Sequence, residues 1–255
     1  MKTKLFLLMF VLFFCALTAT AQESLSEGQL FFVLENQVIP SRIVQYEKAS
    51  NDLIGLFNRH KIPMSFFAAS TQDFVYYYFT PVEDYTGASL MDNIFGLLRE
   101  KIGTAAYNSI LGQFDGCYNS RKTFMIRQYP ELSYKPEYGS QISDGLNFRH
   151  WTFYFVQAGK EKEAIAIARE WKALYTKHNI TEGYQLYMGD IGTDMPLIFV
   201  ATPAKNAGDY YTKLAAQFKI FGQEGQAILD ETWTALWKYD SKDAYIRPNL
   251  SHLVK

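Results

Sequence analysis

The feature that most constrains the fold is an internal duplication of the 255-residue chain. Short patterns recur at a nearly constant distance, which is the signature of a repeated structural unit. The pairs are Phe31-Phe32-Val33-Leu34 with Phe153-Tyr154-Phe155-Val156 at an offset of 122, His60-x-Ile62 with His178-x-Ile180 at 118, Thr80-Pro81 with Thr202-Pro203 at 122, Ile126-Arg127 with Ile246-Arg247 at 120, and Pro130-x-Leu132-Ser133 with Pro248-x-Leu250-Ser251 at 118. Because small loop insertions explain the drift of the offset, we interpret the chain as two copies of one unit of about 110 residues.

Each copy shows the same order of hydrophobic periodicities. A strand is followed by a run with apolar residues every three or four positions, which predicts a helix. Two short β-rich runs separated by polar turn residues predict a hairpin, and a helical stretch broken near a glycine precedes a closing strand. In the first copy the predicted ranges are 30–37, 43–57, 64–69, 74–80, 88–102, 104–114 and 123–129, and in the second they are 153–156, 164–175, 183–188, 196–202, 207–220, 224–238 and 243–247.

This order predicts an α+β protein made of two tandem ferredoxin-like βαββαβ modules. We place the first module at 22–134, a linker at 135–147 and the second module at 148–255. A single module leaves one sheet face bare, whereas two modules in one chain bury those faces against each other. We therefore expect a pseudo-dimeric α/β barrel.

The order of elements and the duplication resemble the dimeric α/β-barrel superfamily. This superfamily includes NIPSNAP-like proteins, antibiotic-biosynthesis monooxygenase-like domains and chlorite-dismutase-like haem proteins. The resemblance covers nearly all of the chain after its first 21 residues, and it carries no catalytic residue over to this sequence. It implies a cofactor-free monooxygenase-like or a haem-using enzyme as alternatives for the function, and haem is the one cofactor that it brings into consideration.

The first 21 residues are typical of a secretory signal peptide. Lys2 and Lys4 precede an apolar run, and Ala19-x-Ala21 before Gln22 forms a small-x-small cleavage site. We expect an exported protein, periplasmic or extracellular, cleaved near Ala21-Gln22 and without stable membrane insertion afterwards. Its formal charge changes from −1 to −3 when the two lysines are removed, and it carries no basic run, which disfavours a nucleic-acid partner.

The tyrosine-rich strand Phe74 to Pro81 is the first candidate for a ligand site. Alternation places Phe74, Tyr76 and Tyr78 on one face of the sheet and Val75, Tyr77 and Phe79 on the other. The matching strand of the second copy, Leu197-Ile198-Phe199-Val200, has no tyrosine, and aliphatic residues stand where the first copy has Tyr76 and Tyr78. This difference predicts a partly polar cavity at Tyr76 and Tyr78, and tyrosines that pack with their hydroxyls at the solvent edge are the alternative.

Repeated histidines and arginines are the second group of candidates. His60 and His178 offer imidazoles for a ligand or a proton transfer, but each ends a helix, where a cation is stabilised by the helix dipole. Arg127 and Arg247 fall in the closing strands. They are predicted either to bind an acidic ligand or to pair with Glu35 and neighbouring acids.

The motifs that the sequence lacks limit the chemistry. It contains no glycine-rich phosphate loop, nucleophile elbow, H-E-x-x-H or C-x-x-C motif, and no histidine pair with zinc spacing, so we predict no metal site and no cofactor. We expect a small, largely apolar ligand in a cavity between sheet and helices. An enzyme of the resembled superfamily and a non-catalytic surface or scaffold protein remain the alternatives, and the oligomeric state is open.

Overall fold

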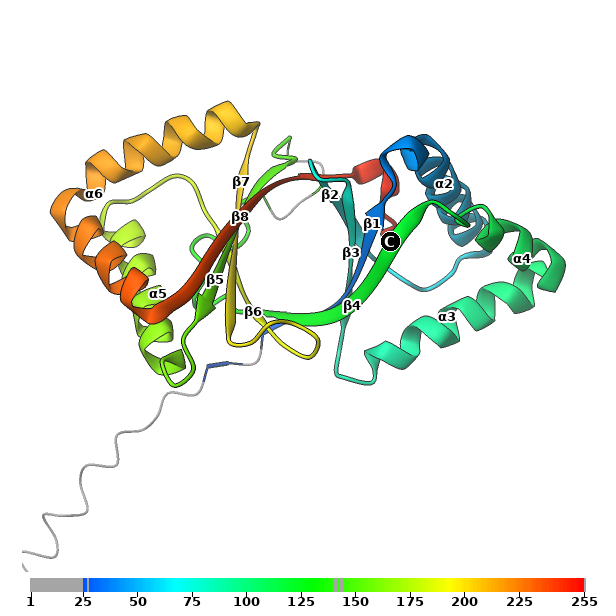
Figure 1. The fold of residues 1–255 in the computed structure, drawn as a ribbon, viewed down its shortest axis with the longest axis horizontal. Coiled ribbons are helices and arrows are strands. Elements are labelled where there is room, and N and C mark those ends of the chain that lie inside the picture. The colour runs from blue at the N-terminus through cyan, green and yellow to red at the C-terminus, as the bar shows by residue number, and fades with distance from the viewer. Residues whose placement is uncertain (1–24, 27, 140–141, 143–144, 255) are drawn as a thin grey trace, which may run out of the picture.

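The computed structural model describes residues 25–26, 28–139, 142 and 145–254. The predicted signal peptide at 1–21 and its cleavage site at Ala21-Gln22 lie outside the described residues. In the described part, strand, helix, strand, strand, helical segment and strand follow one another twice (Figure 1). The first half contains β1 (Leu30–Val38), α2 (Ile43–His60), β2 (Phe67–Thr71), β3 (Val75–Val82), α3 (Gly87–Ile102), α4 (Thr104–Gly112) and β4 (Tyr118–Gln128). The second half contains β5 (Phe148–Val156), α5 (Glu161–Lys177), β6 (Gln185–Gly189), β7 (Leu197–Ala204), α6 (Ala207–Ala235) and β8 (Leu236–Ile246).

The strands close into one antiparallel barrel in the order β1-β3-β2-β8-β5-β7-β6-β4. Each half contributes its strands in the same order, fourth, first, third and second. The pairs β2 with β8 and β4 with β6 join the halves. Helices α2, α3 and α4 cover the outside of one half, and α5 and α6 cover the outside of the other (Figure 1). The expected α+β class and the closed barrel are therefore both present.

The strand register shows that the two copies are offset by 118 residues in their first and last strands. Leu30 of β1 lies opposite Val82 and Arg127, and Phe148 of β5 lies opposite Ala204 and Tyr245. The predicted offsets of 122 for the first strand and 120 for the last were wrong. In the third strand the offset is 122, because the β6–β7 hairpin is longer than the β2–β3 hairpin.

Several predicted boundaries also differ from the structure: β5 begins at Phe148 instead of 153, and β2 begins at Phe67 instead of 64. The second helical stretch of the second copy ends at Ala235 instead of 238, since β8 begins at Leu236. The closing strands β4 and β8 are longer than expected. Their first halves, such as Asn119 to Lys122, are polar and exposed, so the sequence showed no hydrophobic strand pattern there. The predicted glycine break in the second copy is a kink inside α6 at Gly222, whose φ of 54° favours glycine.

Aromatic side chains of both halves line the barrel interior, where they surround cavities of about 660 and 330 Å³. Tyr77 and Phe79 of β3 pack inward against Trp151 of β5 and Phe199 of β7. Tyr76 and Tyr78 point outward to the helices of the first half. The predicted alternation along this strand is therefore confirmed from Val75 onward, whereas Phe74 lies in the turn before it.

The segments that follow the two closing strands cross to the opposite half. Leu132 packs in the helix layer of the second half, and Leu250 packs in that of the first, and both are fully buried. The hydroxyl of Ser133 accepts from the backbone N–H of Leu186 at 2.9 Å, and that of Ser251 accepts from Ala68 at 2.9 Å. The repeated Pro-x-Leu-Ser pattern therefore marks a reciprocal exchange of segments 129–134 and 247–252.

Candidate functional site

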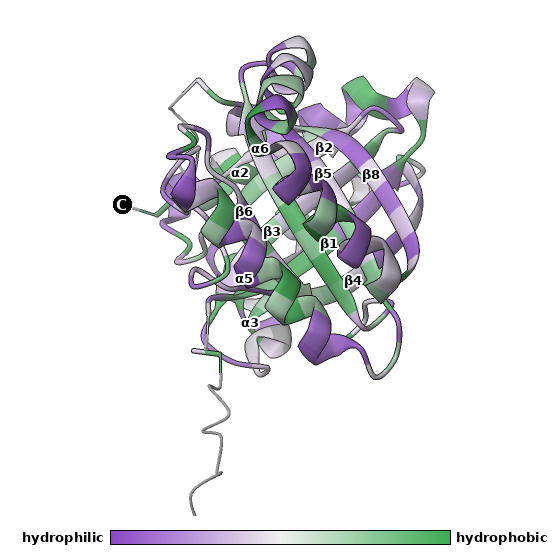
Figure 2. Cartoon of the chain, turned by 90° about the vertical axis from the view of Figure 1, so that its left-hand side faces the viewer, coloured by the Kyte–Doolittle hydropathy of each residue, from purple (hydrophilic) through white to green (hydrophobic). Residues whose placement is uncertain are grey.

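Each half has a cavity between the outer face of its strands and its helices. The first cavity, between β1, β3, α2, α3 and α4, has a volume of about 460 Å³. The second cavity, between β5, β7, α5 and α6, has a volume of about 170 Å³. In Figure 2, α5 and α6 lie in front of the strands of the second half, and β8 beside them is mostly hydrophilic. The two cavities occupy equivalent places, so their walls can be compared residue by residue.

A chain of hydrogen bonds begins at the mouth of the first cavity. Arg121 of β4 is exposed, and its Nε donates to Asn36 Oδ1 at 2.9 Å. Asn36 of β1 is only 2% exposed, and its Nδ2 donates to Tyr46 Oη at 2.7 Å. The guanidinium group of Arg121 lies over the ring of Tyr118, 4.6 Å from its centroid. Two strands and a helix therefore bring one cation and two buried polar groups together in the wall.

The chain continues inward through two more hydroxyl groups. Tyr46 and Tyr78 are hydrogen-bonded to each other through their side chains. Ser50 Oγ donates to the Tyr46 carbonyl at 2.9 Å, so it accepts from Tyr78 Oη at 3.3 Å. Hydrogen bonds in such a series polarise one another. The chain thus runs from Arg121 to a backbone carbonyl and leaves no buried polar atom of these residues unpaired.

Both tyrosines of this chain are neutral phenols. Burial, followed by the neighbouring Tyr78, raises the pKa of Tyr46 well above its usual value. Burial also raises the pKa of Tyr78. An apolar surrounding disfavours the charged form of a phenol. At neutral pH these groups therefore donate hydrogen bonds and do not accept protons.

The polar chain is confined to the first half. The first-half residues Asn36, Tyr46, Ser50, Tyr78 and Arg121 correspond in the second half to Tyr154, Ala164, Ala168, Val200 and Tyr239. Residues that serve a shared scaffold recur in both copies, as the two Pro-x-Leu-Ser segments do. Since none of the five recurs, the chain is not required to build the fold.

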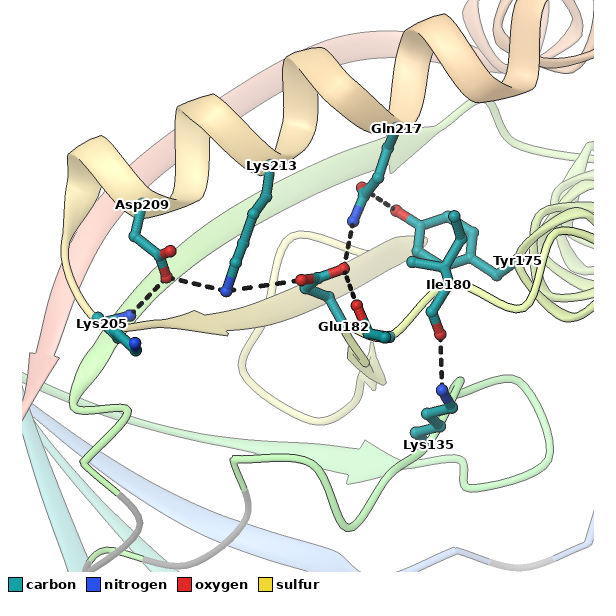
Figure 3. A network of polar contacts seen from close by, with 9 residues as sticks. Lys135, Tyr175, Ile180, Glu182, Lys205, Asp209, Lys213 and Gln217 are labelled. Carbon is teal, nitrogen blue, oxygen red and sulfur yellow. Dashed lines mark hydrogen bonds and ion pairs between the residues drawn. The ribbon is translucent and has the colours of Figure 1, made fainter.

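The second half uses polar groups differently, to hold its helix layer closed (Figure 3). Lys213 Nζ of α6 lies 3.1 Å from Asp209 Oδ2 and 3.5 Å from Glu182 Oε1. Gln217, also on α6, accepts from the Tyr175 hydroxyl at 3.1 Å and donates to Glu182 Oε2 at 3.5 Å. This network ties α6 to α5 and to the connection before β6.

The first half lacks the matching partners of that network. At the offset of 118, Tyr175 and Glu182 correspond to Phe57 and Met64, and both of these line the first cavity. The α3 residues that line it include Met91 and Phe95. The helix layer of the first half is therefore apolar where that of the second is polar, and the space beneath it is larger.

Of the residues predicted from the sequence, Tyr78 lines the first cavity. Tyr76 packs against Tyr46 with ring centroids 5.0 Å apart, but its hydroxyl donates to Glu47 Oε1 at 2.6 Å, away from the cavity wall. Glu47 also pairs with Arg247, whose Nη2 lies 2.8 Å from Glu47 Oε1. Arg247 therefore forms an ion pair with a glutamate, as one of the two predictions stated, but the partner is Glu47 and not Glu35.

The other predicted residues lie outside both cavity walls. His60 is the last residue of α2 and is partly exposed. His178 follows α5, with Nε2 3.9 Å from Glu224 Oε2. Arg127 Nη1 donates to the Gly28 carbonyl at 3.1 Å. The predicted match of Arg127 with Arg247 was wrong, because the strand register makes Tyr245 the counterpart of Arg127.

Sequence reasoning missed Asn36, Tyr46 and Arg121. Their signal lies in the comparison of the two copies at the correct offset of 118, which pairs each with an aromatic residue or an alanine. Among the described residues, no group of three metal-ligating side chains occurs, and no helix is both long and apolar enough to cross a membrane.

Comparisons with known proteins identify the fold. No family model matches the chain, and a search of curated proteins finds no match. Among solved structures, the chain is similar to a candidate monooxygenase from Lactobacillus acidophilus NCFM, with a TM-score of 0.54, 7% identity and coverage of 90% of this chain and 100% of that chain. It is also similar to an anthrone oxidase-like protein, with a TM-score of 0.54, 11% identity and coverage of 87% of this chain and 92% of that chain. A third similar structure is chlorite dismutase from Candidatus Nitrospira defluvii in complex with imidazole, with a TM-score of 0.51, 8% identity and coverage of 88% of this chain and 93% of that chain. The chain has the dimeric α/β-barrel fold that its sequence resembles.

The described cavity walls do not fit haem iron. Neither cavity is lined by a histidine or a cysteine. Met64 and Met91 line the first cavity, but methionine ligates haem together with histidine. Burial raises the pKa of Tyr46 and of Tyr78 in the same wall and so disfavours the phenolate that would bind iron. Neither cavity therefore offers a histidine or a cysteine as an axial ligand to a haem.

Proposed function

We propose that the protein binds a small, largely apolar molecule in the first cavity, with one hydrogen-bond-accepting or anionic end of the ligand at Arg121. The observation that carries this proposal is the asymmetry between the copies. The two halves share one scaffold, and only the first half has both a large cavity between strands and helices and a chain of polar side chains in its wall. Apolar walls with a few convergent polar groups are the usual composition of ligand pockets.

Arg121 is the group that fits the polar end of the ligand. Its Nε is occupied by Asn36, which fixes the orientation of the guanidinium plane, and Tyr118 supports one face of that plane. The Nη edge is left to meet a carboxylate or another acceptor, and such charge-assisted bonds are stronger than neutral ones. Asp92 and Asp115 are exposed at the same mouth and favour a ligand with a single acceptor group over a polyanion.

A binding role is better supported than an enzymatic one. The buried groups of the wall are neutral phenols, an amide and a hydroxyl, and none of them is a base near neutral pH. Cofactor-free oxygenation, which the resembled superfamily implies, is the second candidate; one structural neighbour is named as a monooxygenase and one as an anthrone oxidase-like protein, and the candidate rests on fold similarity alone. Oxygen uptake by the protein with its bound ligand would favour that candidate.

The proposal is tested by calorimetric titration with decanoate, which has an apolar chain and one carboxylate. We expect saturable binding to the wild-type protein and about tenfold weaker binding to Arg121→Ala, equivalent to about 1.4 kcal/mol. Arg127→Ala is the matched control, since Arg127 lies outside the cavity wall, and it should bind like the wild type. Equal affinity of all three proteins, or no binding to any, would contradict the proposal.

We also propose that the chain is a fusion of two ferredoxin-like modules, 22–134 and 148–255, and that it is exported after cleavage at Ala21-Gln22. The repeated order of strands in the barrel supports the fusion. The basic, apolar and small-residue order of the N-terminus supports export. N-terminal sequencing of the protein from separated cell fractions tests the cleavage: an unprocessed Met1 in the cytoplasmic fraction contradicts it.

A further inference from the structure

The second cavity differs from the first in size and in chemistry. Its volume of about 170 Å³ is close to that of an engineered apolar cavity of about 150 Å³ that binds benzene. Aromatic and aliphatic side chains form most of its wall, together with tyrosine and threonine hydroxyls. No charged side chain lines it among the described residues. A charged ligand would lose its hydration there without gaining a partner.

One polar group in this wall has an unused hydrogen bond. Tyr184, just before β6, is 7% exposed, and its hydroxyl has no hydrogen-bond partner among the described residues. The neighbouring Tyr175, whose ring is 5.1 Å away, already donates its hydroxyl to Gln217. A buried polar atom without a partner is costly and uncommon. Tyr184 lines the cavity, so its hydroxyl is the polar group whose missing hydrogen bond a bound molecule would supply.

One side chain of the second cavity wall also lies at the protein surface. Phe218 of α6 lines the cavity and is 41% exposed. Four residues later, the kink at Gly222 interrupts the helix. A side chain that both lines a cavity and faces solvent marks the point where a small molecule can enter.

We propose that the second cavity binds a small neutral aromatic molecule with one hydrogen-bonding atom, which pairs with the Tyr184 hydroxyl. An aromatic ring suits the wall because Tyr154, Trp171 and Phe221 present ring faces and edges to the space. The size of the cavity limits the ligand to one ring with a small substituent. This site is separate from the first cavity and does not depend on the function proposed for it.

The test compares phenol with benzene, which have the same ring and differ by one hydroxyl. Calorimetric or NMR titration of the wild-type protein should give tighter binding of phenol. Tyr184→Phe should weaken phenol binding about fivefold, the size expected for one hydrogen bond, and leave benzene within about twofold. Tyr245→Phe, the same change at an exposed tyrosine outside both cavity walls, should alter neither affinity.

Two results would overturn the inference. The first is that Tyr184→Phe leaves the ratio of phenol affinity to benzene affinity unchanged, or that phenol does not bind to the wild-type protein at all. The second is undiminished binding of both molecules to Ala168→Leu, a variant in which a larger side chain fills the space beside Trp171. Decanoate affinity, measured on the same variants, reports on the first cavity and separates the two proposals.

Discussion

Removal of the hydrogen bond between Asn36 and Tyr46 should destabilise the protein in a strongly non-additive way. In Tyr46→Phe, the Asn36 Nδ2 loses its acceptor at 2.7 Å while remaining in a place that is 2% exposed. In Asn36→Leu, the Tyr46 oxygen loses its donor and Arg121 loses its acceptor. A buried group left without a partner costs about 1 to 3 kcal/mol, so each single variant should lose about 2 kcal/mol of unfolding free energy.

The double variant Asn36→Leu/Tyr46→Phe is expected to lose about as much as either single variant. Replacing both partners by apolar groups leaves no unpaired donor or acceptor between them. The coupling energy of this cycle should therefore be about 1 to 2 kcal/mol. The second half supports the estimate, since the same scaffold carries Tyr154 and Ala164 at these places.

Urea denaturation followed by tryptophan fluorescence measures the four free energies, provided that the dependence on urea stays the same across the cycle. Losses that add within about 0.5 kcal/mol would refute the reasoning. Such a result would mean that Asn36 and Tyr46 are each satisfied elsewhere in solution.

Three further predictions follow from the fold and the site. Leu132→Ala and Leu250→Ala should each lower the unfolding free energy by about 2 to 5 kcal/mol, because each leucine is fully buried. In Leu250→Ala, hydrogen exchange should become faster in α2 and β2 of the first half. Faster exchange confined to the second half would contradict the segment exchange. Haemin titration should give no saturable Soret shift, because no histidine or cysteine lines either cavity between sheet and helices, and a saturable shift abolished by a single substitution would contradict this. Burial, and then the Glu47 carboxylate, raises the pKa of Tyr76 to about 12. The unfolded phenol ionises near pH 10, so stability should fall as the pH rises from about 10 to 12, and a fall of equal size in Tyr76→Phe would contradict the assignment.

The order of elements was predictable because each copy repeats the same periodicities. The offsets of the first and last strands were not, since short aromatic and Ile-Arg patterns also recur by chance. The errors of four and two residues are even numbers. In a strand such errors leave each matched pair of side chains on the same face. In the third strand, alternation placed Tyr77 and Phe79 on one face, and the structure shows that this face points into the barrel.

The exchange of segments could not be predicted from the sequence. Leu132 and Leu250 were recognised as a repeated pattern, but either leucine can pack in its own half or in the other, and only the closure of the barrel decides between them.

The candidate site was predictable only in part. Tyr78 was identified because the aligned residue of the other copy is a valine, and such an alignment requires the correct offset between the copies. Asn36, Tyr46 and Arg121 come from three elements that are separated by up to 85 residues. Their meeting depends on the packing of α2 and on the pairing of β1 with β4, and periodicity does not carry this information.

Native mass spectrometry of the purified protein tests the central claim most directly. The wild-type protein, isolated without added ligand, should carry one small molecule per chain that disappears on denaturation. Arg121→Ala should lose this excess mass, and Arg127→Ala should keep it. An excess mass that persists in Arg121→Ala, or a bare chain mass in all three proteins, would contradict the assignment of the first cavity as the binding site.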